Sequence, residues 1–587
     1  MKGFDVLKVK SAVKNHNKFD LSRTHLTTME FGQIVPLLAE ETVPGDKFSI
    51  DADYFSRLAP LALPTYGKFS FKTVNAFVPY YMIAEDADAW MAGKTTWEGS
   101  TPVQRTITVG DLFNFVVNYC TVLGNATNTN LTYVSSSGTV SYRKFTNQGR
   151  YWVKILNSLG YALPENVDEQ SGSTWQTTIK SIRLSAYPLL AFFKLYNDYM
   201  SQSQRFNTSA LSSFLQNVKY NKSASGYTPS TGVIGFTGMK VMFDALFLNY
   251  ENGYFTSAWQ NPNTALNSTE GPTQMIVPSN ASAEGRILIG TDDQQLQVSV
   301  NPGSPSTSII GQRALDFLQS FDNWVRRNNY TGSRAVQQIY SRFGIKTDDY
   351  RSHYAQVIST DSLPVQVGDI TSTADTTGAV LGDYAGKGIM AGNKGFSCNV
   401  SDYGIIFVLG YFTVVPMMAY GYDRKVLRTN PLDYYNPEFD GLGADAISAG
   451  EVYENPIQDP SADTTKMTDV FGFTERYNAY RYGRDQITGD FRSYVSSDPM
   501  NAWHTGRNLA AIRNAGNLVA QSTSMNTLPQ TNSEYNIMFN NTSGDVDHFY
   551  LTCKFKVDAI RPMLNLNQVP RLGEGDTVVP RNGNVIS

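Results

Sequence analysis

The clearest secondary-structure signal in this chain lies close to its C-terminal end. From His548 to Val557, apolar side chains alternate with polar or tyrosine side chains, which is the period-two pattern of a strand with one buried face. The same alternation occurs towards the other end of the chain, at residues 68–73. A long, loop-rich middle separates the two segments. A closed β core therefore requires the two ends of the chain to pair with each other.

Two further parts of the chain carry strand signals. Between Phe31 and Pro79, short apolar runs alternate with turn sequences such as Val43-Pro44-Gly45-Asp46. The longest apolar run, residues 405–418, is too short to cross a bilayer as a helix, and we predict buried strands there. A glycine cluster at residues 382–395 lacks the order of a phosphate-binding loop and instead predicts a flexible loop.

From about residue 93 to residue 311 the chain is rich in Asn, Ser, Thr and Gly, with segments such as Gly124–Thr139 and Asn261–Ser282 that could hardly build a core alone, and we predict surface insertions. A helix within them begins near Pro188 and carries one apolar stripe. A second helix follows at about residues 312–327 and ends in two arginines, where the helix dipole favours cations. We expect both helices to pack against the core.

Charge is scarce and unevenly distributed. Charged residues make up 17% of the chain and its formal net charge is −4, so any contact with nucleic acid must be local. Residues 1–25 are the basic exception, and we interpret them as a flexible arm that neutralises phosphates, with a disordered solubilising tail as the alternative. The cations of this arm, which are the candidate nucleic-acid contacts, are Lys2, Lys8, Lys10, Lys14, Lys18 and Arg23.

No arrangement of residues predicts catalysis, a metal site or a cofactor. The five histidines are scattered, and we interpret His504 as a structural or interface residue. The three cysteines, Cys120, Cys398 and Cys553, have no metal-ligand spacing, and their odd number favours a reducing cytoplasm. The first 20 residues do not have the pattern of a secretory signal.

A series of short motifs runs through both ends and the middle of the chain. The most specific is Phe471-Gly472-Phe473-Thr474-Glu475-Arg476-Tyr477, followed by Tyr480-Arg481-Tyr482. The others are Phe19–His25, Thr27-Thr28, Pro44–Asp46, Phe77–Pro79, Ala186–Tyr199, Gly332–Arg334, Ser341–Gly344, Ile487–Gly489, Phe491–Ser493, Ala502–His504 and Arg561–Met563. Together they resemble, in order, the major capsid proteins of the Microviridae, especially the gokushovirus-like branch. The chain departs from the family pattern at Met200–Gln202.

This resemblance implies a mainly β fold, an eight-stranded viral jelly-roll β-barrel with long loop insertions and a few helices. It also implies a non-enzymatic major capsid protein whose copies form pentamers and then a T=1 icosahedral shell of sixty copies around a circular ssDNA phage genome. The partners it implies are the protein itself, the genome, a small basic packaging protein, a pilot protein, a scaffold protein and a host surface receptor such as a glycan. The implied location is the virion, assembled in the bacterial host cytoplasm.

The resemblance divides the chain into a basic arm, residues 1–25, and one capsid domain, residues 26–587, formed by both chain ends. The insertion covers about residues 93–311, with a surface protrusion placed within residues 202–301. The polar composition of the protrusion suits receptor or glycan contact, and ordinary loop solubility explains it equally well. A C-terminal extension, about residues 565–587, has no assigned role.

Arginines alternate with aromatic residues in the most specific motif. This pattern suits either salt bridges between subunits or stacking of single-stranded DNA bases beside cations, and we favour subunit contacts. The candidate inter-subunit residues are Arg476, Tyr477, Tyr480, Arg481, Tyr482, Arg492, Trp503 and His504.

Two other classes of protein compete with a capsid protein. The main alternative is an extracellular glycan-binding or adhesin β-protein, which tyrosine- and asparagine-rich loops support and the missing secretory signal opposes. A glycoside hydrolase is the weaker alternative, because nothing in the sequence selects a catalytic pair among the 52 acidic residues.

Overall fold

The architecture was taken from a computed structural model. The residues that it describes are 16–96, 99–124, 131–201, 209–246, 248, 253–255, 285–289, 296–300, 320, 323, 335–345, 354–371, 384–419, 421–440, 444–452, 470–492, 500–506, 535–541, 546–563, 568–569 and 579–580. The predicted helix at 312–327 lies outside this set except for Ser320 and Asn323, and so does much of the predicted protrusion.

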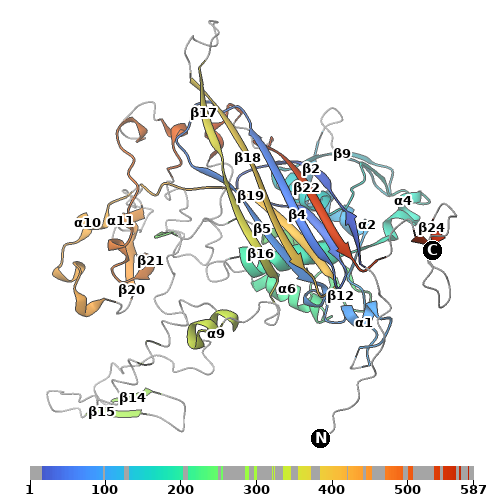
Figure 1. Ribbon diagram of the computed structural model, residues 1–587, viewed down its shortest axis with the longest axis horizontal. Helices are drawn as coiled ribbons and strands as arrows, with labels where there is room; N and C mark the ends of the chain where they lie inside the picture. Colours follow the sequence, from blue (N-terminus) through green and yellow to red (C-terminus); the bar gives the residue numbers. More distant parts are fainter. Residues whose placement is uncertain are drawn as a thin grey trace.

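Two antiparallel sheets form the centre of the molecule (Figure 1). The first sheet has the order β2, β22, β4, β18, β17, and β1 also pairs with β22. The second sheet has the order β16, β5, β19, β3. The strands are β1 (Asn17–Asp20), β2 (Arg23–Met29), β3 (Ile34–Thr42), β4 (Lys47–Leu58), β5 (Phe69–Pro79), β16 (Gln356–Pro364), β17 (Gln366–Thr371), β18 (Tyr384–Asn399), β19 (Gly404–Val414) and β22 (Phe549–Arg561).

The connections between these strands define a jelly roll. Starting at β2, the chain passes from the first sheet to the second and back, so that β2 and β4 belong to one sheet and β3 and β5 to the other. The later strands alternate in the same way: β16 and β19 belong to the second sheet, and β18 and β22 to the first. Eight antiparallel strands in two facing sheets with this order are a double Greek key. The predicted mainly β, eight-stranded jelly-roll fold is confirmed.

The last long strand, β22, lies between two strands from the beginning of the chain. Phe549 is opposite Leu58 of β4 and opposite Met29 of β2. Along β22 the odd-numbered residues from Phe549 to Val557 are buried and face the core, while the even-numbered ones are more exposed. This confirms both the predicted strand and the predicted pairing of the two chain ends.

Aromatic side chains fill the space between the two sheets. The rings of Phe412 on β19 and Phe549 on β22 stack with centroids 4.1 Å apart, and Tyr54 on β4 lies 5.3 Å from Phe71 on β5. Phe31 contacts Phe549 edge-on at 4.7 Å. These rings are almost fully buried, and burying each one stabilises the fold by about 1.5–3 kcal/mol.

Buried strands were predicted within residues 405–418. The structure has one long buried strand there, β19, which confirms the prediction for most of that run.

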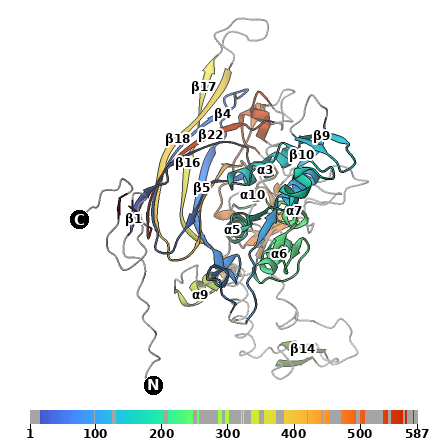
Figure 2. The same ribbon diagram turned by 90° about the vertical axis from the view of Figure 1, so that its right-hand side faces the viewer.

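The insertion after β5 builds a helical layer on the second sheet (Figure 2). Its helices are α1 (Ala87–Met91), α2 (Val109–Phe115), α3 (Asn147–Ser158), α4 (Thr174–Thr177), α5 (Tyr187–Leu195), α6 (Ser209–Lys219) and α7 (Phe236–Asp244). Short strands accompany them: β6 (Thr106–Thr108), β7 (Thr121–Leu123), β8 (Leu131–Val134), β9 (Val140–Phe145), β10 (Asn166–Asp168), β11 (Arg183–Ser185), β12 (Tyr227–Thr228) and β13 (Val233–Ile234). The helix predicted near Pro188 is α5, which is confirmed.

The interpretation of residues 93–311 as surface insertions is corrected in part, because their helices contribute a core of aromatic side chains. Phe115 on α2 stacks on Trp152 of α3 with centroids 5.6 Å apart and lies 5.1 Å from Phe243 of α7. Phe193 on α5 lies 5.0 Å from the same Phe243, and these rings belong to one apolar cluster with the barrel. Composition hid this core because its aromatic residues come from separate helices that stand among many polar residues.

The glycine cluster at residues 382–395, predicted as a flexible loop, is also corrected: most of it is β18, which pairs with β4 over eleven residue pairs. A Cβ atom on Gly388 would come within 2.6 Å of Leu58, and one on Gly392 within 2.5 Å of Leu363. The glycines therefore make room for leucine side chains of neighbouring strands rather than loosening the backbone. In both views β17 and β18 run beyond the other strands (Figures 1 and 2).

A smaller unit, which we call the satellite, lies to one side of the barrel and has an apolar core of its own (Figure 1). Phe255, Met418, Ile447 and Phe471 are members of that core. Its elements are α10 (Arg424–Leu427), β20 (Ala444–Ser448), α11 (Ala449–Val452) and β21 (Val470–Glu475), with β20 and β21 forming an antiparallel pair. Elsewhere β14 (Gly285–Ile289) pairs with β15 (Leu296–Val300), α9 covers Ala335–Phe343, and β23 (Gln568–Val569) pairs with β24 (Val579–Pro580).

Candidate subunit interface

The satellite is organised around one buried carboxylate. Glu451 of α11 is 1% exposed and accepts a 2.6 Å hydrogen bond from the Arg424 guanidinium. Its other oxygen accepts from the hydroxyl of Tyr254 at 3.1 Å, and the Ser448 amide donates to the first oxygen at 3.1 Å. Arg424 also pairs with Asp445 on β20. Because a buried charge needs such partners, these contacts fix α10, β20 and α11 relative to one another.

The surface of the satellite carries a cluster of tyrosines and arginines. We call it the tyrosine–arginine patch, and its members are Arg428, Tyr434, Tyr435, Tyr477, Tyr480 and Arg481. The Arg428 guanidinium lies 3.9 Å from the centroid of the Tyr480 ring, a cation–π contact. Tyr435 lies 5.1 Å from Tyr477 and 6.1 Å from Tyr480. Tyr434, Tyr435 and Tyr480 are each about half exposed.

Contacts within the chain hold this patch rigid. Backbone amides of Tyr435 and Asn436 donate to the hydroxyl oxygens of Tyr480 and Tyr477 at 3.2 and 3.3 Å. Tyr477 has φ = 60°, a left-handed conformation that is rare for a residue with a side chain, and its ring is buried. The patch therefore presents ring faces and guanidinium groups in fixed positions. Protein interfaces are enriched in this combination of residue types.

Two arginines of the predicted set are found here, Arg481 within the patch and Arg476 beside it. Arg481 pairs with Asp440 at 2.9 Å and with Glu475 at 3.3 Å, both on the surface. The Arg476 guanidinium lies 5.0 Å from the Phe439 ring and 5.3 Å from the Tyr477 ring. Of the eight candidate inter-subunit residues, the structure thus gathers Arg476, Tyr477, Tyr480 and Arg481 at one surface.

The other four candidate residues connect the satellite internally and to the barrel. Tyr482 stacks on Tyr254 with centroids 5.0 Å apart, and Arg492 donates to the carbonyls of Ile487 and Ala419. Trp503 lies 5.6 Å from Tyr66. The final candidate, His504, is buried.

Both ring nitrogens of His504 have hydrogen-bond partners within the chain. The Gly506 amide donates to Nδ1 at 2.9 Å, so that nitrogen acts as an acceptor. The other nitrogen, Nε2, lies 3.1 Å from the carbonyl oxygen of Phe491 and donates to it. Both contacts are to backbone, which supports the structural interpretation of this histidine.

The described end of the predicted arm is part of the barrel. Lys18 lies in β1 and pairs with Asp558 at 3.0 Å, while Arg23 lies in β2 and pairs with Glu40 at 3.0 Å. Both side chains therefore have a carboxylate partner within the chain. The remaining candidate contacts to nucleic acid lie outside the described residues and are Lys2, Lys8, Lys10 and Lys14.

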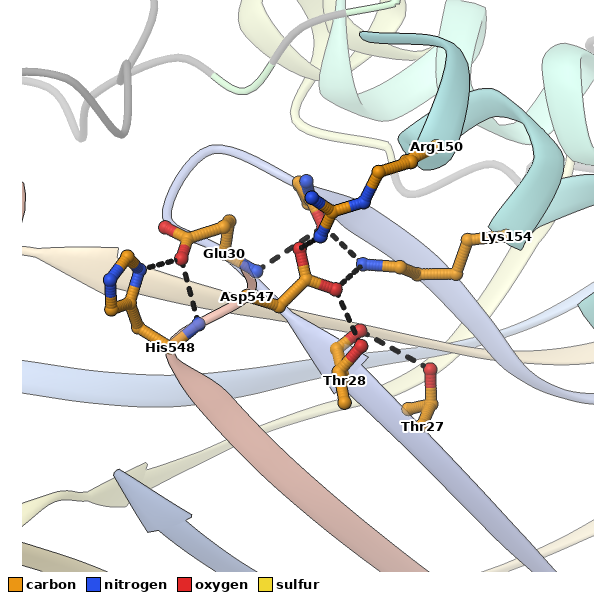
Figure 3. Close-up of polar contacts among 8 residues, drawn as sticks. Thr27, Thr28, Glu30, Arg150, Lys154, Asp547 and His548 are labelled. Atoms are coloured by element: carbon orange, nitrogen blue, oxygen red, sulfur yellow. Dashed lines mark hydrogen bonds and ion pairs between the residues drawn. The ribbon is translucent and has the colours of Figure 1, made fainter. Parts of the chain in front are cut away.

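A second polar cluster, which the sequence did not indicate, joins helix α3 to the barrel (Figure 3). Asp547, just before β22, accepts from Lys154 at 2.7 Å and from Arg150 at 3.1 Å, and it also accepts from the Thr28 hydroxyl at 2.5 Å. Burial alone would raise the pKa of Asp547, but the charge and hydrogen bond of Lys154, with Thr28 and Arg150, outweigh burial and lower it.

The neighbouring His548 completes this cluster. It is 1% exposed, its Nδ1 bonds to the buried Glu30 carboxylate, and its Nε2 lies 2.6 Å from the Asn541 carbonyl oxygen. Burial opposes a charge on the ring, but the hydrogen bonds to Glu30 and Asn541 and the Glu30 charge outweigh it and raise the pKa of His548. Glu30 is 518 positions away in sequence, so only the folded chain brings the pair together.

None of the described helices has the length and apolarity needed to cross a membrane. Among the described residues, no three or more His, Cys, Asp or Glu side chains gather in a group that could hold a metal ion. The three cysteines are all free thiols, and Cys120 and Cys553 are buried. Burial raises the pKa of all three thiols. It raises the pKa of Cys120 and of Cys398 to about 12.

The fold is a jelly roll of the kind that forms viral shells, and its satellite carries an exposed cluster of tyrosines and arginines. A family model described as capsid protein (F protein) matches residues 7–108 and 165–571, most of the chain. The chain belongs to this capsid protein family and is a structural component of a virus particle.

Two relatives are similar over nearly their whole length. Capsid protein VP1 of Chlamydia phage 1 is 24% identical over 559 residues, covering 88% of this chain and 90% of the relative. Capsid protein VP1 of Bdellovibrio phage phiMH2K is 22% identical over 507 residues, covering 84% and 86%. The resemblance to Microviridae capsid proteins of the gokushovirus-like branch is confirmed.

Proposed function

We propose that this protein is the major capsid protein of a small bacteriophage and that it assembles into a T=1 icosahedral shell around a circular ssDNA genome. Its copies associate as pentamers, and the sequence family, the jelly roll and the tyrosine–arginine patch support this assignment. The role requires no catalysis, cofactor or metal. Assembly takes place in the host cytoplasm, and the product is the virion.

The observation that carries the proposal at residue level is the tyrosine–arginine patch. Three of its tyrosines are each about half exposed, namely Tyr434, Tyr435 and Tyr480. Burying their apolar surface against another copy would be favourable, because it removes that surface from water. Arg428 and Arg481 offer charge and planar donors to acidic groups of a neighbour. In a closed shell each contact is repeated by symmetry, so that a modest interface is sufficient.

Other partners follow from the same assignment. The chain has a net charge of −4, and the described cations of its arm, Lys18 and Arg23, already pair with carboxylates. Neutralising the genome therefore calls for the remaining arm lysines, a small basic packaging protein or free cations. A scaffold protein, a pilot protein and a host surface receptor, such as a glycan contacted by surface loops, complete the proposed set.

The test is electron microscopy of the purified protein, expressed alone and with its neighbouring genes, combined with an assay for nuclease-protected DNA. Small icosahedra of uniform diameter that protect DNA are the expected result. Protein that stays monomeric in both preparations would contradict the proposal and favour a glycan-binding β-protein.

The patch is tested in the same preparations. We expect Tyr480→Ala to reduce particle yield at least tenfold, because a buried interface tyrosine contributes about 2 kcal/mol or more. Tyr403→Ala is the matched control, since Tyr403 is 44% exposed and lies outside the patch. Equal particle yields for both variants would exclude the patch from the interface and leave the capsid assignment intact.

A further inference from the structure

The first sheet has one face that is open to solvent in the described part of the chain. Its other face packs on the second sheet, and the helical layer of α1–α7 lies beyond that second sheet, on the far side of the barrel (Figure 2). We call the solvent side of the first sheet the open face. Alternate residues of each strand reach it: on β4 the odd-numbered residues from Lys47 to Arg57 are all exposed.

Cations outnumber carboxylates on the open face. The register of β1, β4, β18 and β22 places six cations on it: Lys18, Lys47, Arg57, Lys387, Lys554 and Lys556. The same register places four carboxylates there: Asp20, Asp51, Asp53 and Asp558. The resulting net charge of +2 contrasts with the −4 of the whole chain. The open face therefore favours an anionic partner over a cationic one.

Most of these charges already have partners within the sheet. Lys554 is opposite Asp53, and Lys556 is opposite Asp51. Lys18 pairs with a carboxylate of β22, as described above. These lysines lie at one end of the open face, and their neighbours neutralise them.

Arg57, at the other end of the open face, is placed differently. Its cross-strand neighbours are Tyr550 on β22 and Ile389 on β18, and neither of them is acidic. Among the described residues Arg57 forms no ion pair. Its guanidinium lies 5.4 Å from the centroid of the Phe55 ring, two positions earlier on the same strand. This arginine can therefore bind an external anion without first breaking an ion pair to a described residue.

Exposed apolar side chains surround Arg57. Phe55 is 40% exposed and Tyr550 is 43% exposed. Leu26 on β2 is 77% exposed and is opposite Thr552, which is in turn opposite Phe55. We call Phe55, Arg57 and Tyr550 the platform. Two aromatic rings beside a guanidinium on the face of a sheet are the arrangement on which proteins stack the bases of single strands.

The position of the platform also suits a ligand inside the shell. The protrusion proposed for receptor contact belongs to the insertion, and the described helices of that insertion lie on the opposite side of the barrel (Figure 2). With the insertion on the outside of the shell, the open face is turned towards the enclosed space.

We propose that the open face binds the enclosed single-stranded DNA, with bases stacked on Tyr550 and Phe55 and a phosphate contacted by Arg57. The inference rests on the proposed function, because it assumes a shell that encloses such DNA. It adds a contact within the folded domain to those expected from the basic arm. The platform binds without reading the sequence, because stacking accepts every base.

The binding of a fluorescein-labelled oligothymidine of about ten nucleotides to the unassembled full-length protein, measured by fluorescence anisotropy, tests the platform. We expect Tyr550→Leu and Phe55→Leu each to weaken binding at least about fivefold, the lower end of what one stacked base contributes. Arg57→Gln should reduce the slope of log affinity against log salt by about 0.7, the value for one phosphate on a single strand.

Two matched controls lie outside the open face. Tyr403→Leu changes a tyrosine that is 44% exposed, just before β19, and Arg183→Gln changes an exposed arginine of β11 in the helical layer. Both should bind within about twofold of the wild type. Equal melting temperatures for all five variants would show that folding is preserved. Wild-type affinity in both ring variants, with a wild-type salt slope in Arg57→Gln, would overturn the proposal.

Photo-crosslinking in particles assembled around DNA that contains 5-iododeoxyuridine locates the bound bases directly. Crosslinked peptides that contain Phe55 or Tyr550 are expected. Crosslinks only elsewhere, in particles that protect DNA, would overturn the platform while leaving the proposed shell function in place. Loss of particles by the platform variants with unchanged oligonucleotide binding would also overturn it, in favour of contact with another copy. Particles without DNA would contradict the shell function, and the anisotropy result would still decide the platform.

Discussion

The barrel and the satellite are stabilised in different ways. In the barrel, rings such as Phe412 and Phe549 pack face to face in the absence of charge, and the long strands pair over many residues. In the satellite, a small apolar core is combined with a buried carboxylate, Glu451, and with arginines that contact tyrosine rings. The difference separates two tasks: apolar burial stabilises the fold, and the polar aromatic surface is available for contact with other molecules.

The largest effect is expected in the barrel. Phe549→Ala removes a ring that contacts Phe31, Phe412 and Phe539, and it should lower the free energy of unfolding by about 3–5 kcal/mol. Phe471→Ala in the satellite core is the matched change, with an expected loss of about 2 kcal/mol because fewer buried groups surround it. Urea denaturation of both variants measures the difference. Equal losses would show that the satellite core is as tightly coupled to folding as the barrel.

The cluster around Asp547 and His548 should give the fold a defined pH range. The folded pKa of Asp547 is below the ordinary value of an aspartate, so its contribution is present above about pH 4 and is lost as pH falls through the lowered pKa. The folded pKa of His548 is above the ordinary value of a histidine, about 6.5, so its contribution is full below about pH 6.5 and is lost as pH rises through the raised pKa. Stability from this cluster is therefore greatest between these limits.

His548→Gln tests the alkaline side of that range. It should cost about 1–3 kcal/mol at pH 6, because Glu30 and the Asn541 carbonyl lose a charged donor, and the decline of stability above pH 6.5 should become shallower. Thermal unfolding from pH 4 to 9 measures both effects. His504→Gln is the control for losing a histidine. An unchanged alkaline slope in His548→Gln would show that another group sets it.

The smallest effect on folding is expected at the patch. Arg481→Ala breaks two ion pairs that lie in water, with Asp440 and Glu475, and should change the free energy of unfolding by less than about 1 kcal/mol. Urea denaturation checks this value. A loss of several kcal/mol would show that the patch stabilises the satellite, which would remove the distinction between the two regions.

Local patterns were sufficient to predict several elements. Alternation predicted β22, an apolar run predicted β19, and a proline followed by an apolar stripe predicted α5. They failed where local composition and tertiary packing disagree. The glycines of β18 suggested a loop. Nothing in the sequence shows that the side chains of Leu58 and Leu363 occupy the positions where Cβ atoms of Gly388 and Gly392 would lie.

The candidate site shows the same division. Arginines and tyrosines close together in sequence identified part of the patch, namely Tyr477, Tyr480 and Arg481. Its other members, Arg428, Tyr434 and Tyr435, come from a segment about 45 residues earlier, as the bond from Tyr435 to Tyr480 shows. No signal in the sequence joins these segments, because they meet only after β20 and β21 pair.

The sequence by itself determined the β character of the chain, the pairing of its two ends and its capsid family. These properties depend on the period of side chains along a strand and on ordered motifs, which are local. Tertiary structure alone decided that the polar insertion has an aromatic core and that Glu30 meets His548. Those contacts join residues from distant segments, and their energies depend on distance and burial, which exist only in the folded chain.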